Sequence, residues 1–306
     1  QKLASKTWRY EYFYWDYVFG IVLCALFFAF TLGSHGENGR SFLTDLRQAD
    51  FSSIGSALLG GIIFNASNIL LSAAIAVCGM SVAFPVGVGL ALVLGVIINY
   101  IGEAKGNPIF IFIGVFLITI AIILNGIAYK KASVDNKKVS VKGLTLAISA
   151  GFIMAFFYRF VAASIDLTSF EHPAAGKMTP YTAVFIFSLG ILTSNFLFNT
   201  IAMKHPVEGK AIPISGYFKG RAITHLVGLL GGIIWCVGQS FSMIASEKAG
   251  AAISYGLGQG ATLVSALWGI LIWKEFKGAT PICRILNMCM FILFLIGLYC
   301  LIYAGA

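Results

Sequence analysis

The chain has 306 residues, of which 58% are hydrophobic and only 11% are charged, and its formal net charge is +9. A soluble globular protein carries roughly 25% charged residues, so the composition excludes a soluble enzyme, a nucleic-acid-binding module or a disordered protein as a description of the whole chain. Between Asp50 and Glu103 lie 52 consecutive uncharged residues, whereas one helical crossing of a bilayer needs roughly 20. The sequence therefore predicts an all-α, polytopic membrane helical bundle.

Nine apolar runs with at most one charged residue each predict membrane-spanning helices, because lipid cannot satisfy free backbone groups and the alternation typical of a membrane barrel is absent. Pro85 is the proline that lies deep in a span, so a kink is expected there, either as a gating hinge or as static packing. The predicted spans are 13–33, 54–78, 80–102, 108–129, 143–165, 180–203, 222–246, 250–273 and 282–304.

The basic residues are distributed unevenly between the two sides of these spans. Fifteen of the 21 Lys and Arg residues fall on the side that carries residue 1, five fall on the opposite side, and Arg159 lies inside a span. Basic residues gather in loops that stay in the cytoplasm. We therefore expect the basic loops, including 130–142, to be cytoplasmic and Ala306 to be external, in a protein of the bacterial inner (cell) membrane.

The chain repeats internally at an offset of 171 residues. Residues 58–64 match residues 229–235, and at the same offset Asn68 corresponds to Gln239. Further glycines agree in this register, whereas apolar bias alone would produce scattered coincidences of Leu and Ile. The sequence therefore contains two related halves.

The second half, residues 135–306, contains five predicted spans, and the first half, residues 1–134, contains four. The counterpart of the span at 143–165 would lie upstream of Gln1, so we expect a protein of ten helices whose first helix is absent from this chain. Halves with an odd number of helices enter the membrane in opposite orientations. The prediction is an inverted five-plus-five repeat.

Short motifs in both halves carry a family resemblance. They are Asn65-Ala66-Ser67-Asn68, Gly79-Met80-Ser81-Val82-Ala83, 94–100, Gly258-Gln259-Gly260, 267–270 and Trp273-Lys274-Glu275. With the ten-helix design, the chain resembles the drug/metabolite transporter superfamily, and within it the branch of ureide permeases and glucose/rhamnose porters. The resemblance implies a permease for a sugar, ureide or nucleobase-like solute. The loop at 130–142 is shorter than the central loop of the plant ureide permeases, so nucleotide dependence is not implied.

Polar side chains inside the spans are the candidate substrate-binding residues. Asn65 and Asn68 share one helix face, and Gln239 and Ser242 repeat that spacing in the second half. Equivalent positions in inverted halves lie near a pseudo-two-fold axis, where transporters of this design bind their solute. The alternative is hydrogen bonding between helices, worth about 0.6 kcal/mol for each contact.

Three further amides are also candidates. Asn195 and Asn199 form an i, i+4 stripe that could line the cavity. Gln259 lies between Gly258 and Gly260, where small neighbours allow another backbone or a ligand to come close.

Charged residues inside spans are functional hypotheses by default. Arg159 and its neighbour Tyr158 could bind solute oxygen, or Arg159 could extend to the interface or pair with Asp166. Asp16 is the candidate for proton coupling, with an interfacial role at the helix entry as the alternative. His225 is expected to be interfacial.

These residues together predict a secondary transporter that moves a small polar solute by alternating access, with a proton or sodium as the coupling ion. A multidrug or metabolite exporter of the same fold is one alternative, and an intramembrane enzyme is another. The six cysteines and four histidines form no ligand or nucleophile set, so no cofactor, metal or catalytic residue is expected. The partners expected are the solute and the bilayer, with no nucleic acid, and the protein would be a monomer or homodimer.

Overall fold

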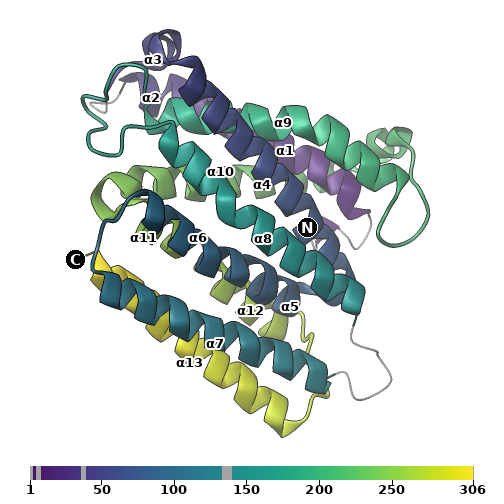
Figure 1. Ribbon diagram of the computed structural model, residues 1–306. Helices are drawn as coiled ribbons and strands as arrows, with labels where there is room; N and C mark the ends of the chain where they lie inside the picture. The colour runs from purple at the N-terminus through teal and green to yellow at the C-terminus, as the bar shows by residue number, and fades with distance from the viewer. Residues whose placement is uncertain (1–2, 5–7, 36–38, 133–139, 306) are drawn as a thin grey trace. The chain divides into compact units, whose positions relative to one another are not determined.

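The computed structural model describes residues 3–4, 8–35, 39–132 and 140–305. Its regular secondary structure is helical throughout the described residues, apart from one isolated bridge between Ile165 and Met178. In chain order the elements are α1 (Tyr10–Phe30), α2 (Leu32–His35), α3 (Phe42–Gln48), α4 (Phe51–Cys78), α5 (Met80–Ala83), η2 (Phe84–Val88), α6 (Gly89–Gly102), α7 (Pro108–Ala132), α8 (Val141–Ala163), α9 (Pro180–Lys204), η3 (Ile214–Lys219), α10 (Ala222–Ala249), α11 (Ala251–Gly258), α12 (Ala261–Leu271) and α13 (Pro281–Ala304) (Figure 1).

Eight of the nine predicted spans are confirmed as helical stretches that are long and apolar enough to cross a membrane, within the described part of the chain. The prediction of one continuous helix over 250–273 is wrong. The segment forms α11 and α12, and the chain turns between them at Gln259 and Gly260, where Gly260 N–H donates to Leu257 O. Gln259 and Gly260 keep dihedral angles of the right-handed helical region, and the hydrogen bonds here run from residue i to i−3. A tight turn of the 3-10 type therefore joins the two helices.

The span Met80–Gly102 contains the irregularity expected at Pro85. Phe84–Val88 form the π-helical turn η2 between α5 and α6. Proline has no N–H to donate and its ring obstructs the preceding turn, so a wider turn at this position relieves both problems. The two segments that correspond in the repeat, 80–102 and 251–271, are therefore both interrupted helices.

The helix boundaries follow the internal repeat that is seen in the sequence. Both α4 and α10 have 28 residues, and their first residues, Phe51 and Ala222, are 171 positions apart. Each helix is followed by a glycine of positive φ, Gly79 at 83° and Gly250 at 82°. A side chain would be strained in that conformation, so both halves make the same sharp turn with the same residue type.

The chain forms two compact units, each built from parts of both sequence halves. Unit 1 comprises residues 1–69 and 157–247, and unit 2 comprises residues 70–156 and 248–306. The division into repeats at 134/135 follows the internal sequence match and remains a prediction.

In unit 1 the helices of one half pack against helices of the other half through glycines. A Cβ at Gly20 of α1 would overlap Leu229 O of α10, and a Cβ at Gly190 of α9 would overlap Leu58 O of α4. Leu58 and Leu229 are equivalent at the offset of 171 residues, and Gly20 and Gly190 lie 170 positions apart, so one packing contact occurs twice with the halves exchanged. A second exchanged pair of contacts joins Gly61 to Phe187 O and Gly232 to Tyr17 O.

In unit 2, α7 and α13 lie side by side (Figure 1). Gly114 and Gly297 bring these two backbones together, because a Cβ on either would come within 3 Å of the carbonyl oxygen of the other. Asn125 Nδ2 donates to Asn287 Oδ1 at 3.5 Å in the same interface. Small residues at a helix contact and an interhelical amide pair are typical of membrane bundles.

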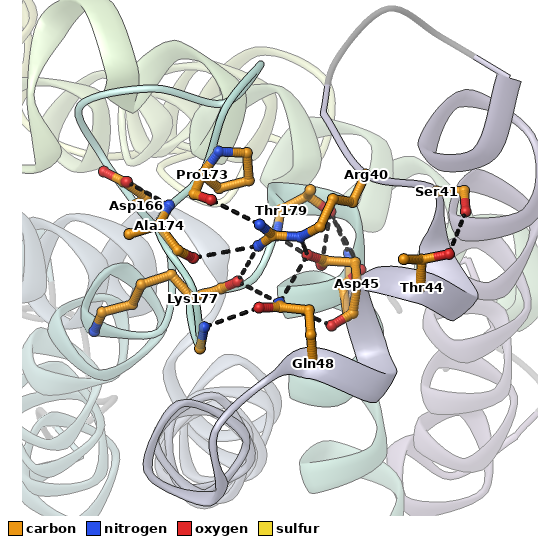
Figure 2. A network of polar contacts seen from close by, with 12 residues as sticks. Arg40, Ser41, Thr44, Asp45, Gln48, Asp166, Pro173, Ala174, Lys177 and Thr179 are labelled. Carbon is orange, nitrogen blue, oxygen red and sulfur yellow. Dashed lines mark hydrogen bonds and ion pairs between the residues drawn. The ribbon is translucent and has the colours of Figure 1, made fainter.

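A polar clamp ties α3 to the segment before α9 at one end of unit 1 (Figure 2). The Arg40 guanidinium donates to Asp45 Oδ1 at 3.0 Å and to the carbonyl oxygens of Pro173 and Lys177, both at 2.7 Å. Asp45 is fully buried and accepts from Thr179 N–H at 2.8 Å. The clamp satisfies backbone groups that would otherwise be unpaired at the start of α9.

Candidate functional site

The two central helices of unit 1 meet at equivalent residues of the repeat. Phe64 of α4 and Trp235 of α10 have ring centroids 4.4 Å apart. Two residues that are equivalent in a two-fold arrangement can touch only close to the axis that relates them. The contact therefore places the pseudo-two-fold relation of unit 1 between α4 and α10, one helical turn from Asn68 and from Gln239.

A hydrogen-bonded network surrounds the amides of α4. Tyr14 Oη on α1 donates to Asn65 Oδ1 at 2.9 Å, and Asn68 Nδ2 donates to Tyr14 Oη at 3.2 Å. Asn65 Nδ2 also donates to Ser194 Oγ on α9 at 2.9 Å. Asn65 is fully buried and uses both ends of its amide between helices. Its observed contacts therefore match the alternative role of joining helices, whereas Asn68 is only partly buried.

Gln239 differs from both asparagines. Its side-chain nitrogen, Nε2, is buried and has no hydrogen-bond partner among the described residues. An unpaired buried donor costs about 1–3 kcal/mol. Such a donor can be satisfied by a solute.

Aromatic rings line the same region. Trp235 is partly exposed and its ring stacks on Phe187 at 6.1 Å, and Tyr17 approaches it at 6.4 Å. Tyr17 also interacts with the Asn68 side chain. A planar polar solute can stack on a ring while amides bond to its edge.

Tyr158 and Ser242, both predicted site residues, meet in unit 1. Tyr158 Oη donates to Ser242 O at 3.0 Å and lies 3.4 Å from Ser242 Oγ, and the tyrosine is 1% exposed. This contact joins α8 to α10 and uses the hydroxyl that was expected to face the solute.

Arg159 makes no hydrogen bond or ion pair with another described residue, and it is partly exposed. The pairing with Asp166 considered from the sequence is not formed. Hydrogen bonds from Thr168 and Ala174 instead outweigh the burial of Asp166 and lower the pKa of that carboxyl. Among the described residues, nothing occupies the guanidinium donors of Arg159. They are therefore available to another group, such as a solute.

The stripe of Asn195 and Asn199 is fully buried. Asn199 Nδ2 donates to Glu11 O on α1 at 2.9 Å, so it joins two helices. Neither polar atom of the Asn195 amide has a partner among the described residues. Gln259, the remaining amide candidate, belongs to unit 2 and forms the turn between α11 and α12.

Asp16 forms a cluster with two residues that lie more than 200 positions away in the sequence. Tyr217 Oη donates to Asp16 Oδ1 at 2.5 Å, and His225 Nδ1 lies 2.9 Å from Asp16 Oδ2. Burial and the neighbouring carboxylate raise the pKa of Tyr217, so its hydroxyl stays protonated and donates. Trp8 packs its ring edge against His225 at 4.7 Å. The cluster pairs a buried carboxylate with a partly exposed imidazole.

A groove of about 610 Å³ lies beside this cluster in unit 1. Its walls are apolar apart from Lys204 and Thr200, and Phe196 and Phe218 at its rim are 59% and 77% exposed. Such a surface suits hydrocarbon and offers little to a solute rich in hydroxyl or amide groups. No group of three or more His, Cys, Asp or Glu side chains that could hold a metal ion occurs among the described residues.

The sequence analysis missed Tyr14 and Trp235 beside the amides of α4 and α10, and it missed Tyr217 beside Asp16. It also assigned His225 to the interface alone. A signal for Trp235 was present, because it is the repeat equivalent of Phe64 and lies one turn before Gln239. Tyr217 lies in a loop with no periodic pattern, so no comparable signal existed for it.

Comparisons with known proteins identify the family of the chain. The sequence profile of the ureide permease family matches residues 13–142 and 130–304. Ureide permease 1 of Arabidopsis thaliana is 24% identical over 347 residues, which covers 94% of this chain and 87% of that protein. Ureide permease 2 of the same plant is 24% identical, with 93% and 87% covered, and ureide permease 3 is 25% identical, with 78% and 77% covered. With its apolar spans, the chain is an integral membrane transporter, not an enzyme, and it belongs to the ureide permease family.

Proposed function

We propose that this protein is a secondary transporter that moves a ureide or nucleobase-like solute by alternating access. The observation that carries the proposal is the unpaired Nε2 of Gln239, one turn from the Phe64–Trp235 contact. A ureide is planar and presents carbonyl acceptors and N–H donors at its edge. Gln239 donates to a solute carbonyl, Trp235 stacks on the solute plane, and Asn68 bonds to the opposite edge.

The names of the relatives support this solute class over others. The matched plant proteins are named ureide permeases, and the same amide and aromatic chemistry binds sugars, the second solute class expected from the sequence. The motifs at Asn65–Asn68 and Gly258–Gly260 support a wider membership, in the drug/metabolite transporter superfamily with the glucose/rhamnose porters.

A proton is the coupling ion that best fits the structure. Asp16 and His225 are close enough to share one proton, and Tyr217 and the edge of Trp8 complete their surroundings, while Gly228 leaves room for the carboxylate. A sodium site would require several oxygen ligands around the ion, and the contacts of Asp16 here come from a phenol and an imidazole.

The proposal includes an orientation in the membrane. The basic loops, including 130–142, face the cytoplasm of a bacterial cell, and Ala306 faces outside, as the ratio of 15 to five basic residues favours. The protein works as a monomer or homodimer. A cysteine placed near Ala306 should react with membrane-impermeant maleimide in intact cells, and labelling only by a permeant reagent would reverse the orientation.

Uptake into proteoliposomes tests the function. Labelled allantoin, nucleobases and sugars are supplied with and without a pH gradient, to wild type and to Asn68→Ala, Arg159→Lys and Asp16→Asn. We expect allantoin or a nucleobase to accumulate with the gradient, a weakened apparent affinity in Asn68→Ala and Arg159→Lys, and loss of gradient dependence in Asp16→Asn. Wild-type affinity in both Asn68→Ala and Arg159→Lys would overturn the central site.

A further inference from the structure

Two carboxylates in unit 2 make equivalent contacts with the halves exchanged. Glu275 follows α12 and accepts from Ser81 N–H at 2.8 Å, from Ser81 Oγ at 2.6 Å and from Met80 N–H at 3.2 Å. Glu103 follows α6 and accepts from Ala251 N–H at 3.3 Å. From the sequence, Glu103 and Glu275 match one another, and Met80 matches Ala251. Each carboxylate therefore caps the first half-helix of the opposite sequence half.

The two contacts lie at opposite ends of one membrane span. Glu275 binds the beginning of the stretch Met80–Gly102, and Glu103 follows its end. The 23 residues between them span roughly 34 Å at 1.5 Å per residue. One carboxylate therefore belongs to each face of the membrane.

The contacts also occur at points where the backbone is built to turn. Gly79 and Gly250, with φ of 83° and 82°, precede the two capped residues. Lys274, immediately before Glu275, has φ of 52° and is the non-glycine residue with positive φ among the described residues. A strained residue beside a hydrogen-bonded side chain is typical of positions that switch.

The carboxylate contacts at the two ends of the span differ in strength in this conformation. Three hydrogen bonds hold Glu275, and one long hydrogen bond holds Glu103. A carboxylate at a helix N-terminus is stabilised by the free N–H groups and by the helix dipole. The Glu275 end is therefore the more tightly closed end of unit 2.

We propose that Glu275 and Glu103 are gate-positioning residues whose contacts with Ser81 and Ala251 break in alternation as the transporter opens first to one side and then to the other. The proposal rests on the transport function proposed above and adds to it two residues that do not touch the solute. It explains why equivalent carboxylates are present at both ends of one span although a single helix cap would suffice for stability.

Cysteine accessibility tests the proposal with a control that the repeat itself supplies. Reporters are placed by Ala83→Cys and Ser254→Cys, equivalent positions that are buried at 0% and 3% exposure, in a background without the six native cysteines. Each reporter is combined with Glu275→Gln or with Glu103→Gln, and the rate of maleimide labelling is measured in proteoliposomes without solute.

The expected shifts have opposite signs. Wild type labels faster at position 254 than at 83. Glu275→Gln raises labelling at 83 at least fivefold and lowers it at 254, and Glu103→Gln does the reverse. Ser81→Ala, which removes only the hydroxyl contact to Glu275, gives the Glu275→Gln result at smaller amplitude and serves if that variant does not fold.

A change at the nearer reporter alone, equal changes at both reporters, or no change at either would overturn the gates, because a merely structural cap loosens its own end without closing the other. Labelling requires no solute, so a result against the gate proposal can be distinguished from a result against the proposed solute. A protein that shows the opposite shifts but accumulates no ureide keeps the gates and loses the substrate.

Discussion

The helices α4 and α10 have the same length and pack through equivalent glycines, but their amides differ in how they are bonded. On α4, Asn65 bonds to Tyr14 and Ser194, and Asn68 bonds to Tyr14. On α10, Gln239 Nε2 has no partner in the described residues. The difference separates two roles that are hard to distinguish from sequence. Asn65 is bonded at both ends of its amide and joins helices, whereas Gln239 has a donor left for a solute.

The largest effect on stability should come from the equivalent glycines Gly61 of α4 and Gly232 of α10. Gly232→Ala on α10 places a Cβ against Tyr17 O, and Gly61→Ala on α4 places one against Phe187 O. Both clashes involve backbone, which cannot move aside cheaply, so each variant should lose about 3 kcal/mol of stability, the upper end of the usual cost of overpacking. Thermal unfolding in detergent measures the loss, and a loss in only one of the two helices would break their equivalence.

Asn65→Ala tests the bonded side of the comparison. The change leaves the buried hydroxyl of Tyr14 without its acceptor and removes the bond to Ser194, which should cost about 1–3 kcal/mol of stability. Thr193→Ala is the control, because that exposed hydroxyl bonds within its own helix. An Asn65→Ala protein as stable as the control would contradict a role in joining helices.

Gln239→Ala tests the unbonded side, and the expected result is reversed. Stability should change little because an unpaired group is removed, whereas solute affinity should fall roughly 5- to 150-fold, as a loss of about 1–3 kcal/mol implies. Ser240→Ala is the matched control on the same helix, since Ser240 Oγ bonds to its own Cys236 O at 2.8 Å. Equilibrium binding and unfolding are measured on both, and unaltered affinity in Gln239→Ala would remove the residue from the site.

The smallest effect on stability should come from the glycines of α4 and α10 at which an added Cβ would have no close neighbour. A Cβ at Gly55 or at Gly238 has no described atom within 4 Å. Gly55→Ala and Gly238→Ala should therefore raise stability by about 0.5–1 kcal/mol, because alanine loses less entropy in a helix. A loss at Gly238 would indicate that another helix or a second copy covers that face.

The sequence predicted the periodic and repeated features of the molecule well. The spans follow from long apolar runs. The correspondence of Asn68 with Gln239 follows from the repeat offset of 171 residues, which also separates the first residues of α4 and α10. The break at Gln259 was missed because glycines favour both close helix packing and a helix end, and composition does not distinguish the two. The pairing of Asp16 with His225 and the clamp of Arg40 with Asp45 depend on contacts between distant segments, which no local pattern reports.

The exchanged glycine contacts also determine when the protein can finish folding during synthesis. Gly20 packs against the backbone of Leu229, which leaves the ribosome 209 residues later, or roughly 10–40 s at 5–20 residues per second. For that interval the glycine face of α1 has no native partner and must be covered by lipid or by the insertion machinery. A ribosome stalled before residue 229 would therefore present α1 as an inserted helix that is not yet packed, and protease sensitivity of such nascent chains should fall once α10 has entered the membrane.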